Sequence, residues 1–544
     1  MRIRLKIIIV FVLILAQSCD NQLDIEQNDN ITSETLYASE SGALAGLAGV
    51  YSRIVSAYRE AEINALYPSS FTDEGHYNRV GAFSYIKNDF SSSDTKLKDV
   101  WTSYYEGIVS VNTFLTGVKN SNLDVSLKQE LIAEGRFLRA FIYFDLEKAF
   151  GGEEGIPMQL EETIGQLLPR TKGIDVYKQI ISDLEFAEQN LPEDTEITPG
   201  RAGKGAARGL LARAYLYIAG EPFNEAGAYQ KAKEWCETII NDPYYELNPS
   251  YEDVFNKLAM EEYDGKEVLF QIGFSFANSD VYQASKLGAV AGMLVHDEGC
   301  GKGFALLNAT ITLIQKYRSD LSDERGWWNV TPYYVPRLNN CNPVLLNNQF
   351  LEVASKYRRT LENNNINSSY GAHHWPVLRF SDVLLMYAEA ENKLNPGSSL
   401  ALNAVNKVRN RAKATPLTYI NEELIQDERL LELCFEGHRK FDLLRWGILE
   451  EKVVETKETM EALAADTNFV NSDWAILAEA NLGEDGIPLS GDEPDVLEVR
   501  YNSFSSSFSY LDGYNNFDIS KHYILPIPEQ ELGVNTNLSQ TKGW

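Results

Sequence analysis

Apolar residues recur at helical spacing in several paired stretches of this chain. Residues 203–219 place Leu210, Leu211 and Ala214 on one face, and residues 228–240 repeat the pattern after a proline break. Apolar positions three and four apart form one stripe along a helix. Small residues on that stripe allow two helices to cross closely. These two segments therefore predict one helix pair.

Three further pairs follow the same pattern. They are residues 42–58 with 100–118, 127–152 with 175–191, and 382–394 with 401–412. A single pair cannot bury its apolar stripe, so the pairs must stack on one another, as in tetratricopeptide repeats of about 34 residues. We expect a mostly α-helical, tetratricopeptide-like scaffold of about four pairs, near residues 42–118, 127–191, 203–241 and 382–412.

Long insertions without helical periodicity separate these pairs. They cover residues 59–99, 244–375 and 465–520 and are rich in polar and aromatic residues. Long irregular segments on a regular scaffold usually carry the function. We expect one domain over residues 19–544, with the insertions forming its ligand-binding face.

The first 18 residues have the pattern of an export signal. Three basic residues precede an unbroken apolar run over residues 7–16, about half of the roughly 20 residues that a membrane-spanning helix needs. The run ends in "LAQSC", which resembles a bacterial lipoprotein signal with Cys19 as the lipidated new N-terminus. Ala16 stands where leucine is usual, as in the looser form common in Bacteroidetes. A plain signal peptide that happens to end near a cysteine is the alternative.

Charge and cysteine content narrow the possible partners. Asp and Glu outnumber Lys and Arg by 78 to 49, for a formal net charge of −29, which disfavours nucleic acid and anionic membrane surfaces. Membrane contact is expected only through the lipid anchor. Cys236 and Cys434 lie in helical patterns and are expected in the core, whereas the sequence leaves open whether Cys300 and Cys341 pair. Since no cysteine has metal-ligand spacing, we predict no metal or cofactor; a structural calcium ion stays undecided.

The stretch "FEGHRKFDLLRWG" (residues 435–447) has the densest charge in the chain. On one continuous helix, acidic and basic residues would alternate along one face at spacings of three and four: Glu432, Glu436, Arg439, Asp442 and Arg445. A catalytic reading would make Glu436 and Asp442 an acid/base pair. A nearby arginine lowers a carboxyl pKa, whereas a general acid needs the opposite shift. We therefore interpret these five residues as a structural ion network, with no catalytic residue.

Aromatic and polar side chains alternate in the insertions, which suits a sugar ligand. A sugar ring presents an apolar face that stacks on an aromatic plane, and its hydroxyls need polar partners. The candidate ligand contacts are Tyr67, Tyr77, Arg79, Tyr85, Asn88, Tyr282, Trp327, Trp328, Tyr370 and Trp375. For each of them, packing onto the scaffold remains the alternative. Trp101, Tyr104 and Tyr105 have core spacing and are expected inside.

Several motifs follow one another in an order that resembles a known family. They are "SCDNQLDIEQ", "GALAGLAGVYSRI", "VWTSYYEGIVSVNTFL", "AEGRFLRAFIYFDLEKAFGG", "RFSDVLLMYAEAENKL", "ALNAVNKVRNRA", "ERLLELCFEGHRKFDLLRWG" and "HYILPIPEQELGVNTNLSQTKGW". From Cys19 to Trp544 the chain resembles the SusD/RagB-type outer-membrane nutrient-binding lipoproteins of Bacteroidetes.

The resemblance implies a function that periodicity does not show. Such proteins sit on the cell surface as lids over a SusC-like TonB-dependent transporter, capture a glycan or sometimes a peptide, and pass it on; they are not enzymes. A peptide-binding member of the same family is one alternative. A secreted glycoside hydrolase is a more distant one, and it would need two carboxylates about 5–10 Å apart across a cleft.

Overall fold

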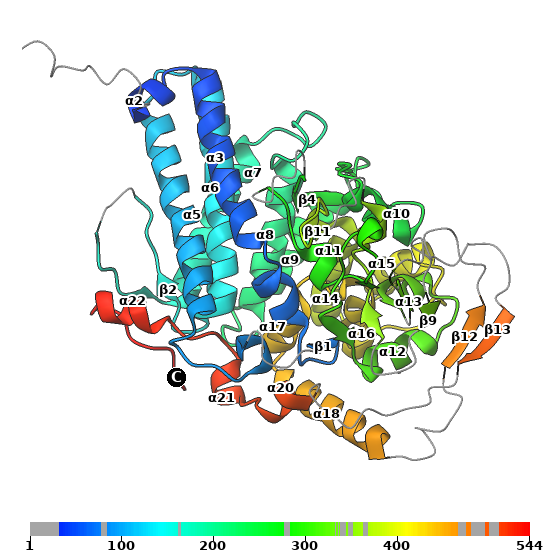
Figure 1. The fold of residues 1–544 in the computed structure, drawn as a ribbon. Helices are drawn as coiled ribbons and strands as arrows, with labels where there is room; N and C mark the ends of the chain where they lie inside the picture. Colours follow the sequence, from blue (N-terminus) through cyan, green and yellow to red (C-terminus); the bar gives the residue numbers. More distant parts are fainter. Residues whose placement is uncertain are drawn as a thin grey trace, which may run out of the picture.

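The computed structural model describes residues 32–77, 84–161, 165–276, 283–331, 333–335, 337, 344–345, 352–362, 368–465, 475–479, 495–499 and 511–544. Over these residues the protein is mostly α-helical, and short strands and irregular segments gather beside the helical scaffold (Figure 1). Apolar side chains from most of the helices and strands form one large core. The predicted fold class is confirmed.

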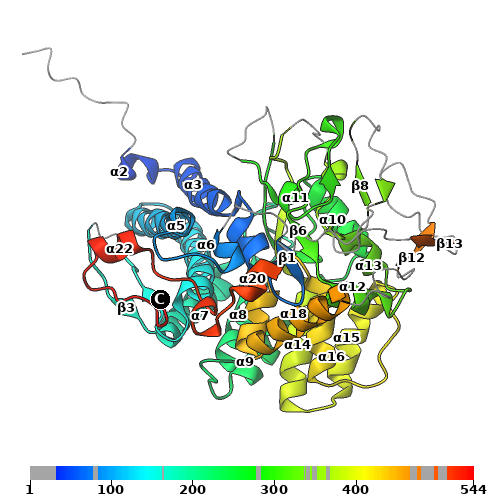
Figure 2. The same cartoon turned by 60° about the horizontal axis from the view of Figure 1, so that its bottom comes forward.

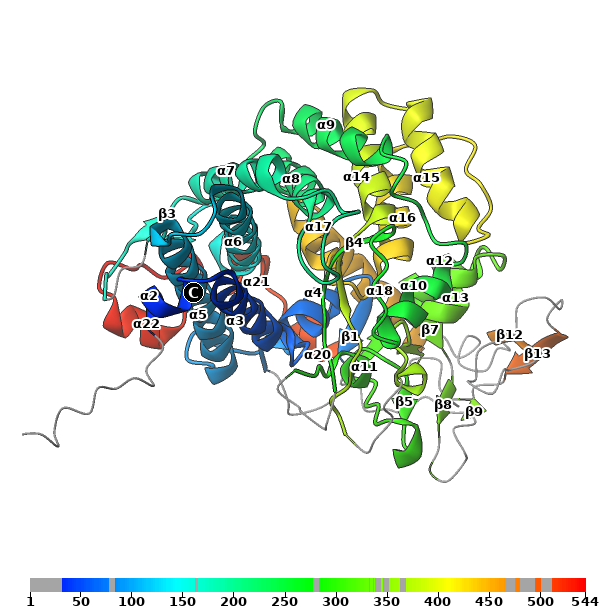
Figure 3. The ribbon, with the colours of Figure 1, turned by 90° about the horizontal axis from the view of Figure 1, so that it is seen from above.

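Helices form over all four predicted pairs of segments. Their bounds are α3 (Glu40–Tyr58) with α5 (Thr95–Asn120), α6 (Val125–Leu146) with α7 (Gly173–Asn190), α8 (Lys204–Ala219) with α9 (Ala228–Ile240), and α14 (Phe380–Leu394) with α15 (Ser399–Arg411). Each helix packs against the next in this order, and the row curves in the view from above (Figure 3). Stacking in this way buries the apolar stripe that one pair leaves open.

Spacing and capping explain why these segments are helical. In α9 the buried residues Ala228, Ala232, Cys236 and Ile239 lie on one face. The side chain of Asp94 accepts a hydrogen bond from the backbone N–H of Lys96 at 2.8 Å, at the start of α5. Such a cap satisfies one of the backbone donors that a helix leaves free at its N-terminus.

The segments between the helix pairs contain short strands. A four-stranded sheet has the order β1 (Gly75–Tyr77), β6 (Leu307–Ala309), β10 (Val353–Ala354) and β7 (Val330–Thr331). The remaining strands pair as β4 (Val268–Ile272) with β11 (Trp375–Arg379), β2 (Ile156–Pro157) with β3 (Arg170–Thr171), and β12 (Ala475–Glu479) with β13 (Asp495–Val499). A three-stranded sheet has the order β5 (Leu294–Val295), β8 (Tyr333–Val335) and β9 (Val344–Leu345). The first sheet joins residues 75–77 to 307–309, so it ties two insertions together.

The remaining helices complete the described structure. The α-helices are α2 (Ser33–Leu36), α4 (Tyr67–Ser69), α10 (Tyr251–Ala259), α11 (Leu287–Val290), α12 (Ile311–Arg318), α13 (Glu324–Asn329), α16 (Glu422–Leu433), α17 (Arg439–Arg445), α18 (Leu449–Ala465), α20 (Asp512–Asn515), α21 (Ile519–His522) and α22 (Glu529–Val534). The π- and 3₁₀-helical turns are η1 (Glu62–Leu66), η2 (Ser84–Lys87), η3 (Glu147–Gly151), η5 (Glu298–Cys300) and η7 (Arg359–Leu361). Among the described residues, no helix is both long enough and apolar enough to cross a bilayer.

The C-terminal segment returns to the first helix pairs. The backbone N–H of Leu525 donates to the carbonyl of Ala149 at 2.9 Å, and the side-chain amide of Asn535 donates to the carbonyl of Leu168 at 2.8 Å. In Figure 2, α22 lies beside α5. This contact places the end of the chain next to its first helices.

One predicted helix is wrong. The continuous helix expected around residues 432–448 is broken, because α16 ends at Leu433 and α17 begins at Arg439. Between them Phe435 and Gly437 have φ values of 64° and 79°, in the left-handed region that a right-handed helix cannot include. The turn brings the backbone N–H of Phe435 to the carboxylate of Glu74 at 2.9 Å, so a tertiary contact compensates for the broken helix.

Candidate functional site

Buried arginines and carboxylates form a cluster near the C-terminal ends of β11 and α16. Arg379 is 1% exposed and contacts Glu267, Glu432 and Glu436 at 3.3, 2.9 and 2.7 Å. Glu432 also pairs with Arg411 at 2.5 Å and with Arg325 at 3.1 Å. These partners come from helices and strands far apart in the sequence, so the cluster holds the scaffold and the insertions together.

The charges in this cluster set each other's ionisation. Burial by itself would raise the pKa of Glu432, but the guanidinium groups of Arg411, Arg379 and Arg325 outweigh burial and hold it below its usual range. The pKa of Glu436 is lowered in the same way, with burial opposed by Arg379 and Lys356. Both carboxyls are therefore ionised, which suits ion pairing and not proton donation.

A second group of ion pairs links α17 to the scaffold. Asp442 accepts hydrogen bonds from Arg429 and Arg445 at 2.9 Å each. Arg445 also pairs with Glu389 on α14, and Arg429 pairs with Asp382 on α14 at 2.8 Å. The short helix α17 is thus attached to α14 and α16 by charge.

Arg439 fixes the first insertion to α17. Its guanidinium contacts both carboxylate oxygens of Asp73, at 2.8 and 2.5 Å, and both side chains are buried. All five residues of the predicted ion network, Glu432, Glu436, Arg439, Asp442 and Arg445, lie in buried ion pairs. The expected stripe along one helix is wrong, because most partners come from other elements.

Most of the predicted ligand contacts in the first insertion are buried. The aromatic side chains of Tyr67, Tyr77 and Tyr85 are enclosed, and so is the Asn88 amide. The Tyr85 hydroxyl donates to Glu62 at 3.0 Å, and the Asn88 amide donates to the carbonyl of Gly513 at 2.9 Å. The expectation that these four face a ligand is corrected, because the insertion folds onto the scaffold and uses them for packing.

Two predicted tryptophans are buried as well. The indole N–H of Trp328 donates to the carbonyl of Lys356 at 3.2 Å, and Trp375 lies in β11 with its ring 6.0 Å from that of Tyr357. Their assignment as ligand contacts is corrected to core packing.

Four other residues named from the sequence lie outside the described residues: Cys19, Arg79, Tyr282 and Cys341. Cys300 is disulfide-bonded.

Of the predicted contacts that the structure describes, Trp327 and Tyr370 stay partly exposed. The guanidinium of Arg318 lies 4.7 Å from the centre of the Trp327 ring. The Tyr370 hydroxyl donates to Glu60 at 2.9 Å, and Lys286 Nζ lies 4.9 Å from its ring centre. Each ring is therefore partly exposed and has charged groups of the protein beside it.

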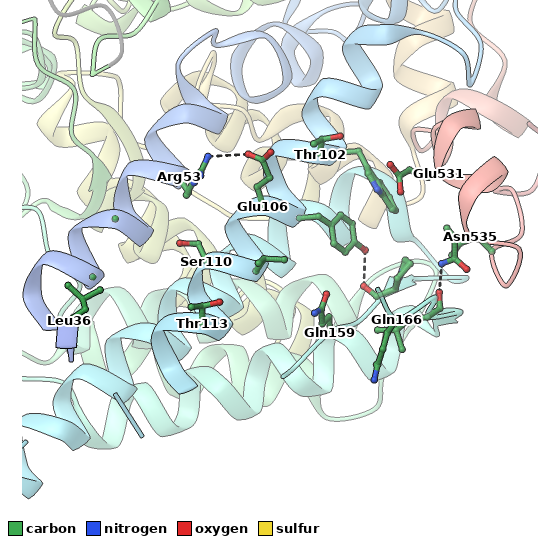
Figure 4. Close-up of a pocket in the computed structure, with 18 of the residues that line it drawn as sticks. Leu36, Arg53, Thr102, Glu106, Ser110, Thr113, Gln159, Gln166, Glu531 and Asn535 are labelled. Atoms are coloured by element: carbon green, nitrogen blue, oxygen red, sulfur yellow. Dashed lines mark hydrogen bonds and ion pairs between the residues drawn. The ribbon is translucent and has the colours of Figure 1, made fainter. Parts of the chain in front are cut away.

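A groove that sequence reasoning did not find lies on the first helices. It has a volume of about 830 Å³ and is lined by residues of α3 and α5, by Pro157, Gln159, Gln166 and Leu168, and by the C-terminal segment (Figure 4). Tyr105, which the helical spacing placed in the core, is half-buried and lines it. Its walls come from segments far apart in the chain, so no local pattern could have indicated it.

Among the described residues, no group of His, Cys, Asp and Glu suits a metal ion.

Comparison with known proteins assigns the family. The model of the SusD family matches residues 213–544, more than half of the chain, and the model described as "Starch-binding associating with outer membrane" matches residues 20–216. A relative from Formosa agariphila, SusD-like protein P25, is 27% identical over 83% of this chain and 92% of its own.

Solved structures show the same fold. A SusD homologue from Bacteroides thetaiotaomicron superposes with a TM-score of 0.79 at 23% identity, covering 94% of this chain and 98% of that chain. Surface glycan-binding protein A from the same species, in complex with laminarihexaose, superposes with a TM-score of 0.66 at 18% identity, covering 92% and 99%. The sequence resemblance is thus confirmed, and the chain belongs to the SusD family.

Proposed function

We propose that this protein is a cell-surface glycan-binding lipoprotein that captures an oligo- or polysaccharide and delivers it to a SusC-like TonB-dependent outer-membrane transporter. The observation that carries the proposal is the fold shared, over nearly the whole chain, with a surface glycan-binding protein in complex with laminarihexaose. The matching family model described as starch-binding and associating with the outer membrane adds support. The buried, arginine-paired carboxylates of the ion cluster are consistent with binding without catalysis.

The partly exposed aromatics Tyr370 and Trp327 are the proposed contacts on the loop face. Glu60 and Lys286, which pair with each other beside Tyr370, are charged groups next to this ring that a ligand hydroxyl would meet. Stacking plus a few hydrogen bonds suits a micromolar ligand, about −8 kcal/mol, which a binding protein can release again.

Tyr370→Ala is expected to weaken glycan binding by about 3- to 10-fold, because an aromatic contact contributes about 0.5–1.5 kcal/mol beyond its area. Calorimetry with a panel of neutral and acidic glycans and with peptides measures the effect. Tyr419→Ala is the matched control, since Tyr419 is 64% exposed between α15 and α16. If Tyr370→Ala and Tyr419→Ala bind the glycan with equal affinity, Tyr370 is not part of the site. Tight binding of peptides alone, or release of reducing ends from any glycan, contradicts the proposed function.

Attachment to the outer membrane is proposed to occur through Cys19. Acyl chains contribute about 0.8 kcal/mol per buried CH₂, and two or more chains anchor a protein durably. Cys19→Ala is expected to move the protein from the membrane fraction to the soluble fraction and to abolish incorporation of labelled palmitate. Cys236→Ala is a control for general loss of a cysteine. A Cys19→Ala protein that stays fully membrane-bound contradicts the anchor.

A further inference from the structure

The groove on α3 and α5 has the dimensions of a ligand site. Its volume of about 830 Å³ lies in the range of small-molecule sites, roughly 300–1,000 Å³. Helices form one side, and Pro157, Gln159, Gln166 and Leu168 with the C-terminal segment form the other. Figure 4 shows Arg53 and Glu106 across the groove from Gln159 and Gln166. Walls from three separate parts of the chain make it a concave site and not a flat interface.

Small residues of α3 keep the groove open. Ala45, Gly46 and Gly49 line it, and a Cβ added to Gly49 would have no heavy atom within 4 Å. Glycine lowers helix stability by about 1 kcal/mol relative to alanine. At Gly49 the scaffold itself gives no packing reason for glycine, but an occupant of the groove would need that space.

Two polar groups that line the groove, the indole N–H of Trp101 and the side chain of Gln166, have no hydrogen-bond partner among the described residues. Trp101 is 3% exposed and lines the groove, yet its indole N–H has no hydrogen-bond partner among the described residues. Gln166 is exposed and makes no side-chain hydrogen bond within the described part of the chain. Ser110 and Thr113 add hydroxyls from α5. The groove therefore offers donors and acceptors beside the aromatic rings of Tyr37 and Tyr105.

The charge of the groove disfavours anionic ligands. Arg53 is its single basic residue among the described lining, and it pairs with Glu106 at 3.2 Å. Glu531 has no ion-pair partner among the described residues. A carboxylate, sulfate or phosphate on a ligand would thus meet net negative charge. Hydroxyl groups of an uncharged ligand would meet amides, hydroxyls and carboxylates.

We infer that this groove is a second saccharide-binding site, which takes an uncharged oligosaccharide segment and is separate from the loop-face contacts Tyr370 and Trp327. The inference rests on the proposed glycan-binding function. Two sites would hold a long neutral glycan at two places on one protein, which strengthens binding of long chains without a tighter contact at either site.

Gly49→Phe tests the groove directly. A helical side chain lies over the turn N-terminal to its own Cα, so the ring would cover Ala45 and Gly46 and fill the groove. Gly49→Ala is the matched control, because it adds one methyl group into open space. Thermal unfolding should show both variants at least as stable as the wild type, since both residues have higher helix propensity than glycine.

Calorimetry uses neutral hexasaccharides (laminarihexaose, maltohexaose, cellohexaose, xylohexaose and mannohexaose) and hexagalacturonate as the acidic probe. We expect Gly49→Phe to weaken binding of a neutral glycan at least 10-fold at one of two sites, while Gly49→Ala binds as the wild type does. Tyr370→Ala should affect the other site. We expect hexagalacturonate not to bind in the groove of the wild type or of either Gly49 variant.

The outcomes separate the groove from the general function. If Gly49→Phe binds every neutral glycan as the wild type does while Tyr370→Ala does not, the groove inference is overturned and glycan binding stands. Binding of hexagalacturonate that Gly49→Phe abolishes overturns the neutral ligand class. Loss of a co-purifying protein with unchanged glycan affinity shows a protein-docking surface instead. Absence of binding to the whole panel overturns both proposals.

Discussion

Arg379→Met is expected to lower the free energy of unfolding by about 3–5 kcal/mol, since removing one partner from a buried charge cluster leaves the others uncompensated. Arg379 makes hydrogen bonds to Glu436, Glu432, Glu267 and Ser381. Met has a similar volume, so the loss of unfolding free energy measures the removed charge and not a cavity. Guanidinium denaturation with linear extrapolation measures it.

The matched control for Arg379→Met is a surface pair. Arg53→Met removes the pair with Glu106, in which both side chains are 55% exposed. Exposed pairs contribute about 0–1 kcal/mol, so this variant should unfold almost as the wild type does. Similar losses in the two variants would show that the buried cluster does not stabilise the fold more than a surface pair.

Gly437→Ala is expected to destabilise the protein by about 2–4 kcal/mol, through backbone strain and a steric overlap. Gly437 has a φ of 79°, and a Cβ there would lie 2.3 Å from the backbone oxygen of Asn64. Backbone atoms cannot move away as a flexible side chain does, so the turn between α16 and α17 must shift.

Gly397→Ala separates the two causes. Gly397 has a similar φ of 76°, but a Cβ there would have no heavy atom within 4 Å. Gly397→Ala should lower the free energy of unfolding only by the cost of placing alanine in the left-handed region, roughly 1–2 kcal/mol. The difference between the two variants, measured by thermal and chemical unfolding, gives the cost of the overlap with Asn64. Equal losses at both positions would contradict the close contact between this turn and the first insertion.

Local patterns predicted the scaffold well. The face containing Ala232 and Cys236 is buried against neighbouring helices as its spacing indicated. The charged residues of the 435–447 stretch were expected in ion pairs, and each of those singled out has a buried partner of opposite charge. Periodicity predicts burial here because residues three to four apart lie on the same face of a helix.

The same reasoning failed where chain segments meet only in the folded state. Tyr77 and Tyr85 lie in an irregular insertion, where no period indicates which side faces inward, and strand pairing and packing bury them. The helix over the charged stretch breaks because Phe435 and Gly437 turn toward Glu74, about 360 residues earlier in the chain. A contact over that separation leaves no local signal.

The amino-acid sequence by itself determined the paired helices, the export and lipidation pattern that we predict, the acidic charge, and the motifs of the SusD family. The tertiary structure alone decided which arginine meets which carboxylate, which aromatics remain accessible, and that Gly49, Tyr105 and Glu531 line one groove. The physical reason is that helix formation depends on neighbours a few residues apart, whereas burial and concavity depend on segments that only folding brings together.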